Sequence, residues 1–511
     1  MSAPGAGPAW TAERALPPLL AVAIAWLLLP RVAGFTTDSE SYLDIAGNVL
    51  SGAGLVQRVV DFWRPAAPDP LGLWPPLYPL TVAFLARAGL RLELAARMVS
   101  VLAFVGFAIA FRGLARRVLG RAAALGTTVL ALSTVGVATA AVMAWSEMLF
   151  LALVTGALTG LVELTRNDRV DPSPWRPVVL GALAGLAALT RYIGWFLPLL
   201  GIALLVRARS PRRVVIVWAL AALVLPACWA VRGIALFGSP MGPGATAATV
   251  SLGEALRGAL TGLHWGFVPL PIARVPWLAL VVTAAIGAAV VFALRRRDAA
   301  GVAAWYAVAY LFVLLAVRSQ ATLSEAGGLE LRALQIVDRY LIPIYPFLWL
   351  GAAGAVDGAV RGTAPRRAAG AVLVLAVLAS GVGLAQGIAA APVPPAETVA
   401  READLAALRA LVPAEGGPVL TDVGHRLRNA TGRSAIQVPP RSSWVREFTA
   451  QEEARWRAAG VREAVFRSKA VAAPTASQTY GPYLASRLRP GSPGAWTVVA
   501  ERGGFMLYRI P

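Results

Sequence analysis

The sequence is poor in charged residues, which make up 14% of its 511 positions, whereas soluble domains carry about 25%. It has one cysteine, Cys228, and two histidines. A single cysteine excludes a disulfide within the chain, and so few cysteines and histidines argue against a zinc site built from these residues. Lysine occurs once, as Lys469, so arginine carries nearly all of the positive charge.

Hydrophobic residues are abundant instead, at 57% of the chain. Apolar stretches of about 20 residues, the length that crosses a bilayer, recur between residues 16 and 391. The first, "ALPPLLAVAIAWLLLPRVAGF", is too long for a signal peptide and has no small-residue cleavage site, so we expect it to be retained as a helix. The sequence therefore predicts a multi-pass membrane protein of mainly α class.

The net charge of +20 follows from arginines in the short gaps between apolar runs. By the positive-inside rule these gaps face the cytoplasm, where they would also favour anionic membrane lipids. This placement argues against nucleic acid as a partner. The arginine-rich gaps are 112–121, 166–176, 207–213, 295–297 and 361–367, and the outward gaps are 34–93, 141–146, a turn near 191, 234–275 and 318–339.

This alternation predicts about eleven transmembrane helices in residues 1–391, with the N-terminus in the cytoplasm. We expect the protein to be located in the plasma (inner) membrane. The first outer loop, at about 34–93, should contain two short helices, over 38–50 and 77–88. From 392 to 511 the pattern changes to that of an extracytoplasmic α/β domain. "ETVAREADLAALRALV" predicts an amphipathic helix, and "PVLTD", "SAIQV", "EAVF", "WTVVAE" and "FMLYRI" predict strands.

Ionisable residues at the outward ends of the predicted helices are the candidates for a site. Such groups in membrane segments usually mark a functional path or pair with one another. In this threading they can converge on one cavity. They are Asp38, Glu40, Glu147, Arg191, Arg232 and Arg339.

Short motifs surround these residues in the order "DSESYL", "WPPLYPL", "SE", "LTR", "WAVRG", "FGSP" and "DRYLIP". This order resembles the GT-C superfamily. Its members are polytopic glycosyltransferases that use polyprenyl-phosphate sugars, and they include protein O-mannosyltransferases and the lipid A aminoarabinose transferase. The resemblance implies that Asp38 is the catalytic base. Many members have two adjacent acids in this loop, whereas here Ser39 separates Asp38 from Glu40.

The chemistry that the resemblance implies is transfer of a sugar from a polyprenyl-phosphate donor to a hydroxyl of a cell-envelope glycan, lipid or protein, with inversion. Arg339, Arg191 and Arg232 are expected to hold the donor phosphate, because the guanidinium fork suits phosphate oxygens. Glu40 and Glu147 are expected to be supporting acids or ligands of a possible divalent metal ion. His264 and Trp265 could contact the acceptor sugar.

Simpler interpretations stay open for each residue. Asp38 could cap a helix N-terminus, Glu40 could lie on a solvent-facing side of a helix, and Glu147 could be a capping residue or a structural partner of an arginine. Arg339 could pair with Asp338 or extend to the membrane interface, Arg191 could belong only to a turn, Arg232 could anchor the chain at the interface, and His264 could have no role in the site. A lipid or sugar transporter or flippase is the main rival function, although the sequence lacks repeated halves and its polar groups gather at one face. A non-catalytic membrane scaffold or sensor is the second rival.

Overall fold

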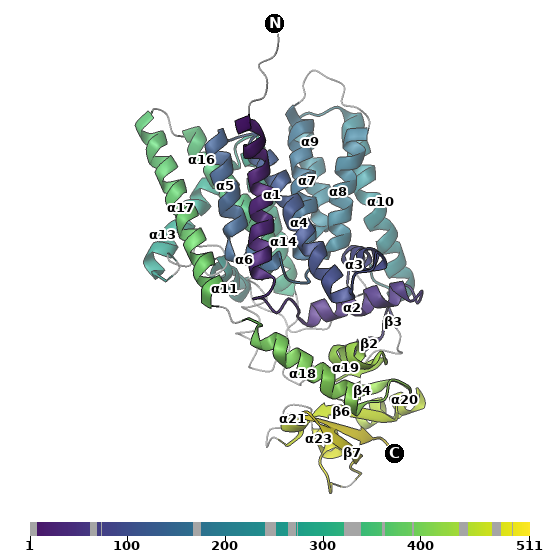
Figure 1. The fold of residues 1–511 in the computed structure, drawn as a ribbon. Coiled ribbons are helices and arrows are strands. Elements are labelled where there is room, and N and C mark those ends of the chain that lie inside the picture. Colours follow the sequence, from purple (N-terminus) through teal and green to yellow (C-terminus); the bar gives the residue numbers. More distant parts are fainter. Residues whose placement is uncertain are drawn as a thin grey trace.

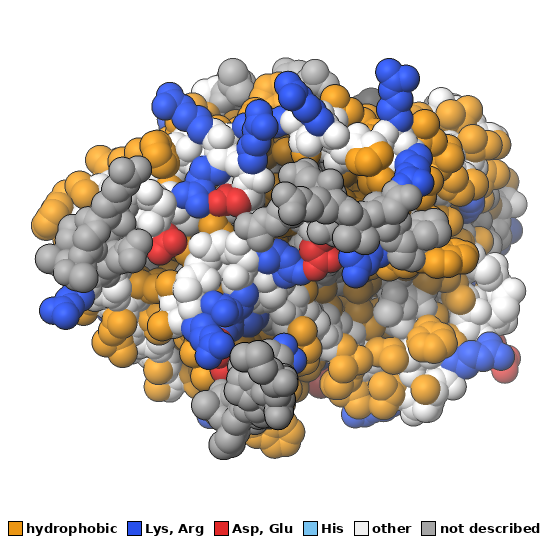
Figure 2. Space-filling view, turned by 90° about the horizontal axis from the view of Figure 1, so that it is seen from above, with side chains coloured by type: hydrophobic (Ala, Val, Ile, Leu, Met, Phe, Trp, Pro, Cys, Tyr) orange, Lys and Arg blue, Asp and Glu red, His pale blue; other side chains and the backbone are white. Residues whose placement is uncertain are grey.

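The computed structural model describes residues 8–61, 69–72, 74–166, 175–240, 252–263, 272, 274–320, 339–359, 363–390, 393–438, 448–472, 482–492 and 494–511. Long helices run side by side in a bundle, and a small α/β domain lies at the end away from the N-terminus (Figure 1). The other end of the bundle carries many arginine side chains (Figure 2). This distribution agrees with the charge alternation along the sequence.

Each of the eleven predicted spans has a helical counterpart. Among the described residues, seven helices are long and apolar enough to cross a membrane. These are α4 (Leu92–Ala115), α7 (Glu147–Arg166), α10 (Arg212–Phe237), α13 (Pro276–Ala293), α14 (Ala299–Gln320), α16 (Tyr345–Ala359, preceded by the short helix η3, Ile342–Ile344) and α17 (Thr363–Ala390). The other counterparts are α1 (Pro8–Leu28), α5 (Arg121–Ser133), which α6 (Val135–Ala140) extends, α8 (Trp175–Thr190) and α9 (Phe196–Arg207, preceded by η1, Tyr192–Trp195).

Large apolar side chains cover the outside of this bundle. Phe312, Trp277 and Leu102 are 72%, 68% and 54% exposed. A contiguous apolar surface of this kind is costly in water and is accommodated by lipid. The chain is therefore a multi-pass membrane protein.

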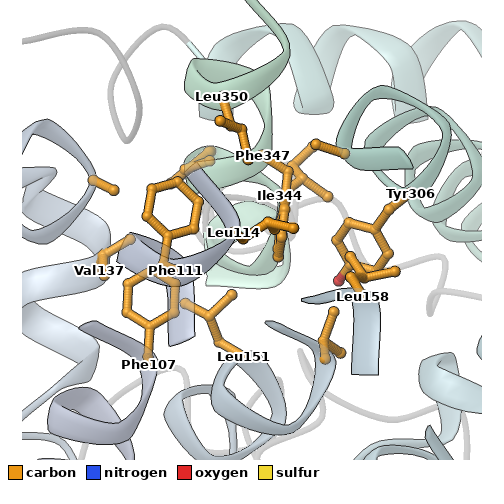
Figure 3. Close-up of a cluster of buried hydrophobic side chains, with 14 of the residues drawn as sticks. Phe107, Phe111, Leu114, Val137, Leu151, Leu158, Tyr306, Ile344, Phe347 and Leu350 are labelled. Atoms are coloured by element: carbon orange, nitrogen blue, oxygen red, sulfur yellow. The ribbon is translucent and has the colours of Figure 1, made fainter. Parts of the chain in front are cut away.

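Aromatic side chains pack in the centre of the bundle and connect several of its helices (Figure 3). The rings of Phe107 and Phe111, on α4, have centroids 5.3 Å apart, and Phe111 meets Phe347 of α16 edge-on at 6.1 Å. Phe347 in turn meets Tyr306 of α14 at 4.6 Å. These edge-on contacts between fully buried rings connect three helices that are distant in sequence.

The backbones of α8 and α10 lie close together, because small residues of α8 face α10. A Cβ added to Gly181 would lie 2.6 Å from the Trp218 carbonyl oxygen, and one added to Gly185 would lie 2.8 Å from that of Ala222. Small residues permit such approach in membranes, where packing rather than water exclusion holds helices together. The α8–α10 contact therefore depends on glycine at both positions.

The segment after α1 forms the two short helices that the sequence predicts, α2 (Thr37–Leu50) and α3 (Leu77–Arg87). Between them, β1 (Val56–Gln57) pairs with β3 (Asp69–Pro70). The third short strand of this segment is β2 (Val59–Asp61). It joins the C-terminal domain, where Val59 lies opposite Ala435.

The C-terminal domain is a six-stranded sheet with the order β2-β5-β4-β6-β8-β7. Strands β2, β5, β4 and β6 are parallel, β8 runs antiparallel to β6, and the edge strand β7 runs antiparallel to β8. All five strands predicted in this region are present: β4 (Val419–Thr421), β5 (Ala435–Gln437), β6 (Glu463–Arg467), β7 (Thr497–Arg502) and β8 (Phe505–Arg509). The helices are α18 (Ala396–Leu411), α19 (Gly424–Thr431), α20 (Ala450–Ala458), α21 (Ser468–Ala472) and α23 (Pro482–Leu488).

Candidate active site

Helix α2 places Asp38 in its first turn. The helix begins after Thr36, whose backbone N–H donates to Ser39 Oγ at 3.0 Å in a capping box. This reciprocal arrangement satisfies the helix N-terminus without the carboxylate of Asp38. Asp38 is therefore available for another partner, and its side chain remains 24% exposed.

That partner is Arg339, the first residue of the helical segment Arg339–Ala359, which contains η3 and α16. Its Nη1 donates to Asp38 Oδ2 at 2.6 Å. On its other edge, Nη2 donates to Glu147 Oε2 at 3.2 Å, and Nε donates to Glu147 Oε1. The guanidinium fork thus bridges two carboxylates, one of them, Glu147, completely buried.

Arg191 completes a group of four charges. Its Nη1 lies 2.8 Å from Glu147 Oε1 and donates to Ser146 Oγ at 3.1 Å. Tyr42, on α2, reaches the same serine, with its hydroxyl 3.2 Å from Ser146 Oγ. Burial, and next the charge of Asp38, raise the pKa of the Tyr42 phenol, so it stays protonated. The carboxylates of Asp38 and Glu147 balance the two arginines.

Aromatic rings flank both guanidinium groups. Arg339 Cζ lies 4.2 Å from the centroid of the Trp145 ring, and Arg191 Cζ lies 5.1 Å from that of Tyr340. Trp145 Nε1 donates to Thr36 Oγ1 at 2.9 Å, which ties the ring to the start of α2. Stacking of this kind fixes the plane of an arginine fork. The sequence did not predict Trp145 and Ser146 as site residues, although they directly precede Glu147.

Glu40 does not join this group. It faces the C-terminal domain, where Arg401 Nε donates to Glu40 Oε1 at 2.7 Å and Asn429 Nδ2 donates to Oε2. Asp44 and Ser41 of α2 also contact the C-terminal domain. Arg428 Nε donates to Asp44 Oδ1 at 3.1 Å, and His425 Nε2 lies 3.2 Å from Ser41 Oγ. This second set of contacts was not predicted, because it depends on how the domain docks.

Helix α2 therefore has two polar faces with different partners. Asp38 and Tyr42 face the bundle, whereas Glu40, Ser41 and Asp44 face α18 and α19. The backbone N–H groups of Arg58 and Val59 also donate to Asp44 Oδ2, at 2.8 and 3.2 Å. These bonds connect α2 to β2, the edge strand of the domain sheet. Asp38 is thus held in place from both sides.

Arg232 has partners outside the group of four charges. Arg232 Nη1 donates to the Leu71 carbonyl oxygen at 2.5 Å, and its guanidinium stacks on Trp229 at 4.5 Å. It therefore supports the loop before α3. His264 and Trp265 lie outside the described residues.

No family model and no curated protein matches this sequence. Solved structures do match its fold. ArnT from Cupriavidus metallidurans, solved without ligand and bound to undecaprenyl phosphate, aligns over 98% of both chains with a TM-score of 0.61 and 17% identity. The oligosaccharyltransferase AglB from Archaeoglobus fulgidus, in complex with an inhibitory peptide and a dolichol-phosphate, aligns over 94% of this chain and 74% of its own, with a TM-score of 0.59 and 12% identity.

The chain has the GT-C fold. The arabinofuranosyltransferase AftD from mycobacteria also matches, over 100% of this chain and 42% of its own, with a TM-score of 0.55 and 16% identity. The resemblance read from the order of motifs is confirmed at the level of fold. The GT-C match also confirms the predicted class, a mainly helical membrane protein with a C-terminal α/β region.

One of the similar structures, the oligosaccharyltransferase from Archaeoglobus fulgidus, was solved in complex with zinc and sulfate. The carboxylates present in this chain do not fit a metal ion as they are arranged. Arg339 bridges Asp38 and Glu147, and Arg401 with Asn429 holds Glu40. Within the described ranges, three or more aspartate, glutamate, histidine or cysteine side chains nowhere form a group that could hold a metal. The predicted metal roles of Glu40 and Glu147 gain no support from these contacts.

Proposed function

We propose that this protein is a membrane glycosyltransferase that moves a sugar from a polyprenyl-phosphate donor to a hydroxyl acceptor. The observation that carries the proposal is the Asp38–Arg339 pair, partly exposed above the buried Glu147 in a chain with the GT-C fold. Two similar structures contain undecaprenyl phosphate and dolichol-phosphate. We further propose that residues 1–391 form the transferase domain and that the end carrying the α/β domain, residues 392–511, is extracytoplasmic.

The change of charge during the reaction explains why arginines suit this site. In the donor, the phosphate is a diester with one negative charge. When the bond between the sugar and the phosphate oxygen breaks, its electron pair stays on that oxygen. The product is a monoester whose second pKa is about 6, so it is largely a dianion at neutral pH. Arg339 and Arg191 would interact more strongly with the product-like transition state than with the donor, which is the requirement for catalysis.

Asp38 is assigned as the base that receives the proton of the acceptor hydroxyl. The acceptor oxygen forms its bond to the anomeric carbon on the face opposite the phosphate, so configuration inverts. A phosphate leaves as a stable anion and needs no acid, in contrast to the alkoxide of glycoside hydrolysis. One carboxylate is therefore sufficient, and such a base typically contributes about 10²–10⁴-fold.

The bond between Asp38 and Arg339 makes these two roles interdependent. A donor phosphate that takes Nη1 of Arg339 replaces Asp38 there and frees its carboxylate for the acceptor. Glu147 keeps its contacts with both arginines, so the cations stay paired after the exchange. In this proposal, Glu147 is a positioning residue and donor binding exposes the base. Arg232, bound to the Leu71 carbonyl oxygen, is assigned to the support of the loop rather than to the phosphate.

The experiment that tests the function is transfer of radiolabelled sugar from a panel of polyprenyl-phosphate sugars, in membranes that contain wild type, Asp38→Asn or Glu397→Gln. Glu397 is an exposed acid at the start of α18 and serves as the matched control. Label that moves to an acceptor with wild type and Glu397→Gln, and is lost with Asp38→Asn, supports both the transferase and its base. Transfer that survives in Asp38→Asn assigns the base elsewhere. Movement of intact donor across the membrane without transfer would support a flippase instead.

A further inference from the structure

A groove lies at the end of the bundle away from the α/β domain, where α1, α4 and α5 meet. It encloses a cavity of about 520 Å³. The space-filling view of this end shows many arginine side chains, with apolar patches among and around them (Figure 2). The groove is lined by Arg14, Arg112, Arg116, Arg117, Arg121 and Ile109, with Glu13 at its edge.

The groove carries an excess of positive charge. Its lining contains five arginines and one acid, Glu13, which binds Arg112. Arg117 binds Glu163 of α7. Signals for membrane topology need only exposed arginines near the helix ends. The burial of one of these five, Arg112, calls for a different explanation.

Arg112 is 8% exposed and lines the groove from α4. Its Nη2 pairs with Glu13, but its Nε and Nη1 are buried and have no hydrogen-bond partner among the described residues. Buried guanidinium donors without acceptors are costly, and a phosphate presents several oxygens, each of which can accept from a donor of this kind. Arg112 therefore indicates an anionic ligand.

The start of α5 supports the same conclusion independently. This helix of 13 residues begins at Arg121, has no acid in its first turn, and has no side-chain hydrogen bond at its cap, Gly120. A cation at the positive end of a helix dipole is unfavourable by itself. An anion between Arg121 and the free backbone N–H groups of this turn would satisfy both.

Below the arginines, the outer face of α4 is apolar and flat. Ile109 and Leu102 are 57% and 54% exposed, and a Cβ added to Gly106 between them would meet nothing within 4 Å. A hydrocarbon chain can lie along this face directly beneath the charged groove. A free phosphate ion would contact only the arginines, whereas a phospholipid would contact both the arginines and the apolar face of α4.

We propose that this groove binds the phosphodiester head group of an anionic phospholipid, with one acyl chain lying on α4 over Gly106. The site is separate from the candidate active site and does not depend on the proposed transferase activity. Arg112 and Arg121 contact the phosphate, and Arg116 and Arg14 surround it.

Native mass spectrometry of the full-length protein tests this proposal by counting bound lipids. We expect wild type to retain phosphatidylglycerol at least tenfold more tightly than phosphatidylcholine. Arg112→Gln and Arg121→Gln should each remove most of this preference, whereas Arg212→Gln, an exposed arginine at the start of α10, should keep it. If Arg112→Gln does not fold, the exposed Arg121 carries the same test.

The acyl chain is tested by Gly106→Leu, which fills the track on α4 and leaves the arginines intact. This substitution should weaken the binding of phosphatidylglycerol and leave the binding of the soluble analogue glycerophosphoglycerol unchanged. Equal retention of the two lipids by wild type would overturn the proposal. So would unchanged preference in Arg121→Gln, or soluble glycerophosphoglycerol binding as tightly as the lipid.

Discussion

Arg339 Nη1 lies 2.6 Å from Asp38 Oδ2, and the two residues are 301 positions apart in the chain. The same guanidinium also binds the buried Glu147 through its other edge. Since Asp38 and Arg339 are both partly exposed and Glu147 is not, the bond to Asp38 is the one that a ligand can replace. Two predictions concern these residues, and two concern the contacts between α2 and the α/β domain.

Replacing Arg339 should lower kcat by a larger factor than it raises the KM for the donor. We expect Arg339→Gln to lower kcat by about 10²–10³-fold, the usual effect of removing one donor to a developing negative charge. Arg339→Lys keeps the charge but loses the fork that reaches two carboxylates, so it should recover only part of the rate. The measurement is kcat and KM for sugar transfer.

The matched control for Arg339 is Arg91→Gln, because Arg91 is exposed and precedes α4 at the same end of the bundle. Its kinetics should equal those of wild type. A raised KM with unchanged kcat in Arg339→Gln would contradict the prediction, since it would indicate equal binding of ground state and transition state.

Removing the charge of Glu147 should destabilise the fold. Glu147→Gln leaves Arg191 and Arg339 without their common buried counter-ion, and loss of one partner of a buried pair typically costs about 3–5 kcal/mol. We expect a clearly lower Tm for the purified protein in detergent. Glu163→Gln on the same helix is the control, because its side chain is 43% exposed and surface pairs contribute about 0–1 kcal/mol. Equal shifts in Tm for the two variants would argue against a buried counter-ion.

The bond between Arg401 and Glu40 should hold α2 in place. We expect Arg401→Gln to speed amide hydrogen exchange over 37–50 and to slow sugar transfer, because Asp38 lies on the same helix. A local loss of about 1.4 kcal/mol would raise exchange tenfold. Arg409→Gln, also on α18 but bound to the Ala430 carbonyl oxygen, should leave exchange in α2 unchanged. Faster exchange confined to the α/β domain would contradict this role.

Acid should loosen the docking of the α/β domain through His425. Burial lowers the pKa of its imidazole below the usual 6.5, although the charges of Asp44, Glu40 and Asp38 oppose this. The unfolded chain then binds a proton that the docked histidine does not, so stability should fall as the pH drops below about 6.5. The measurement is Tm from pH 7.5 to 5.

His425→Gln provides the control for this pH dependence. The amide can still meet Ser41 but does not titrate, so part of the slope between pH 6.5 and 5 should disappear. The paired carboxylates of α2 remain in the variant and titrate as before. An unchanged slope would exclude His425 as the titrating group.

The sequence by itself determined the class of the protein and the membrane helices. Apolar length and arginine spacing are local properties, so 16–391 could be divided into spans before any contact was known. The five strands of the domain were also predicted, since alternation within a strand is local. Strand β2, three residues long, gave no comparable signal because its pairing with β5 joins distant parts of the chain.

Only the tertiary structure decided how the charged residues are paired. The sequence predicted that Asp38, Glu40, Glu147, Arg191, Arg232 and Arg339 could gather at one end of the bundle. It did not distinguish Asp38, which faces Arg339, from Glu40, two positions later, which faces Arg401. Successive residues of a helix point in different directions, and the packing of α2 between the bundle and the domain determines which partner each one meets. That packing is a property of the whole chain.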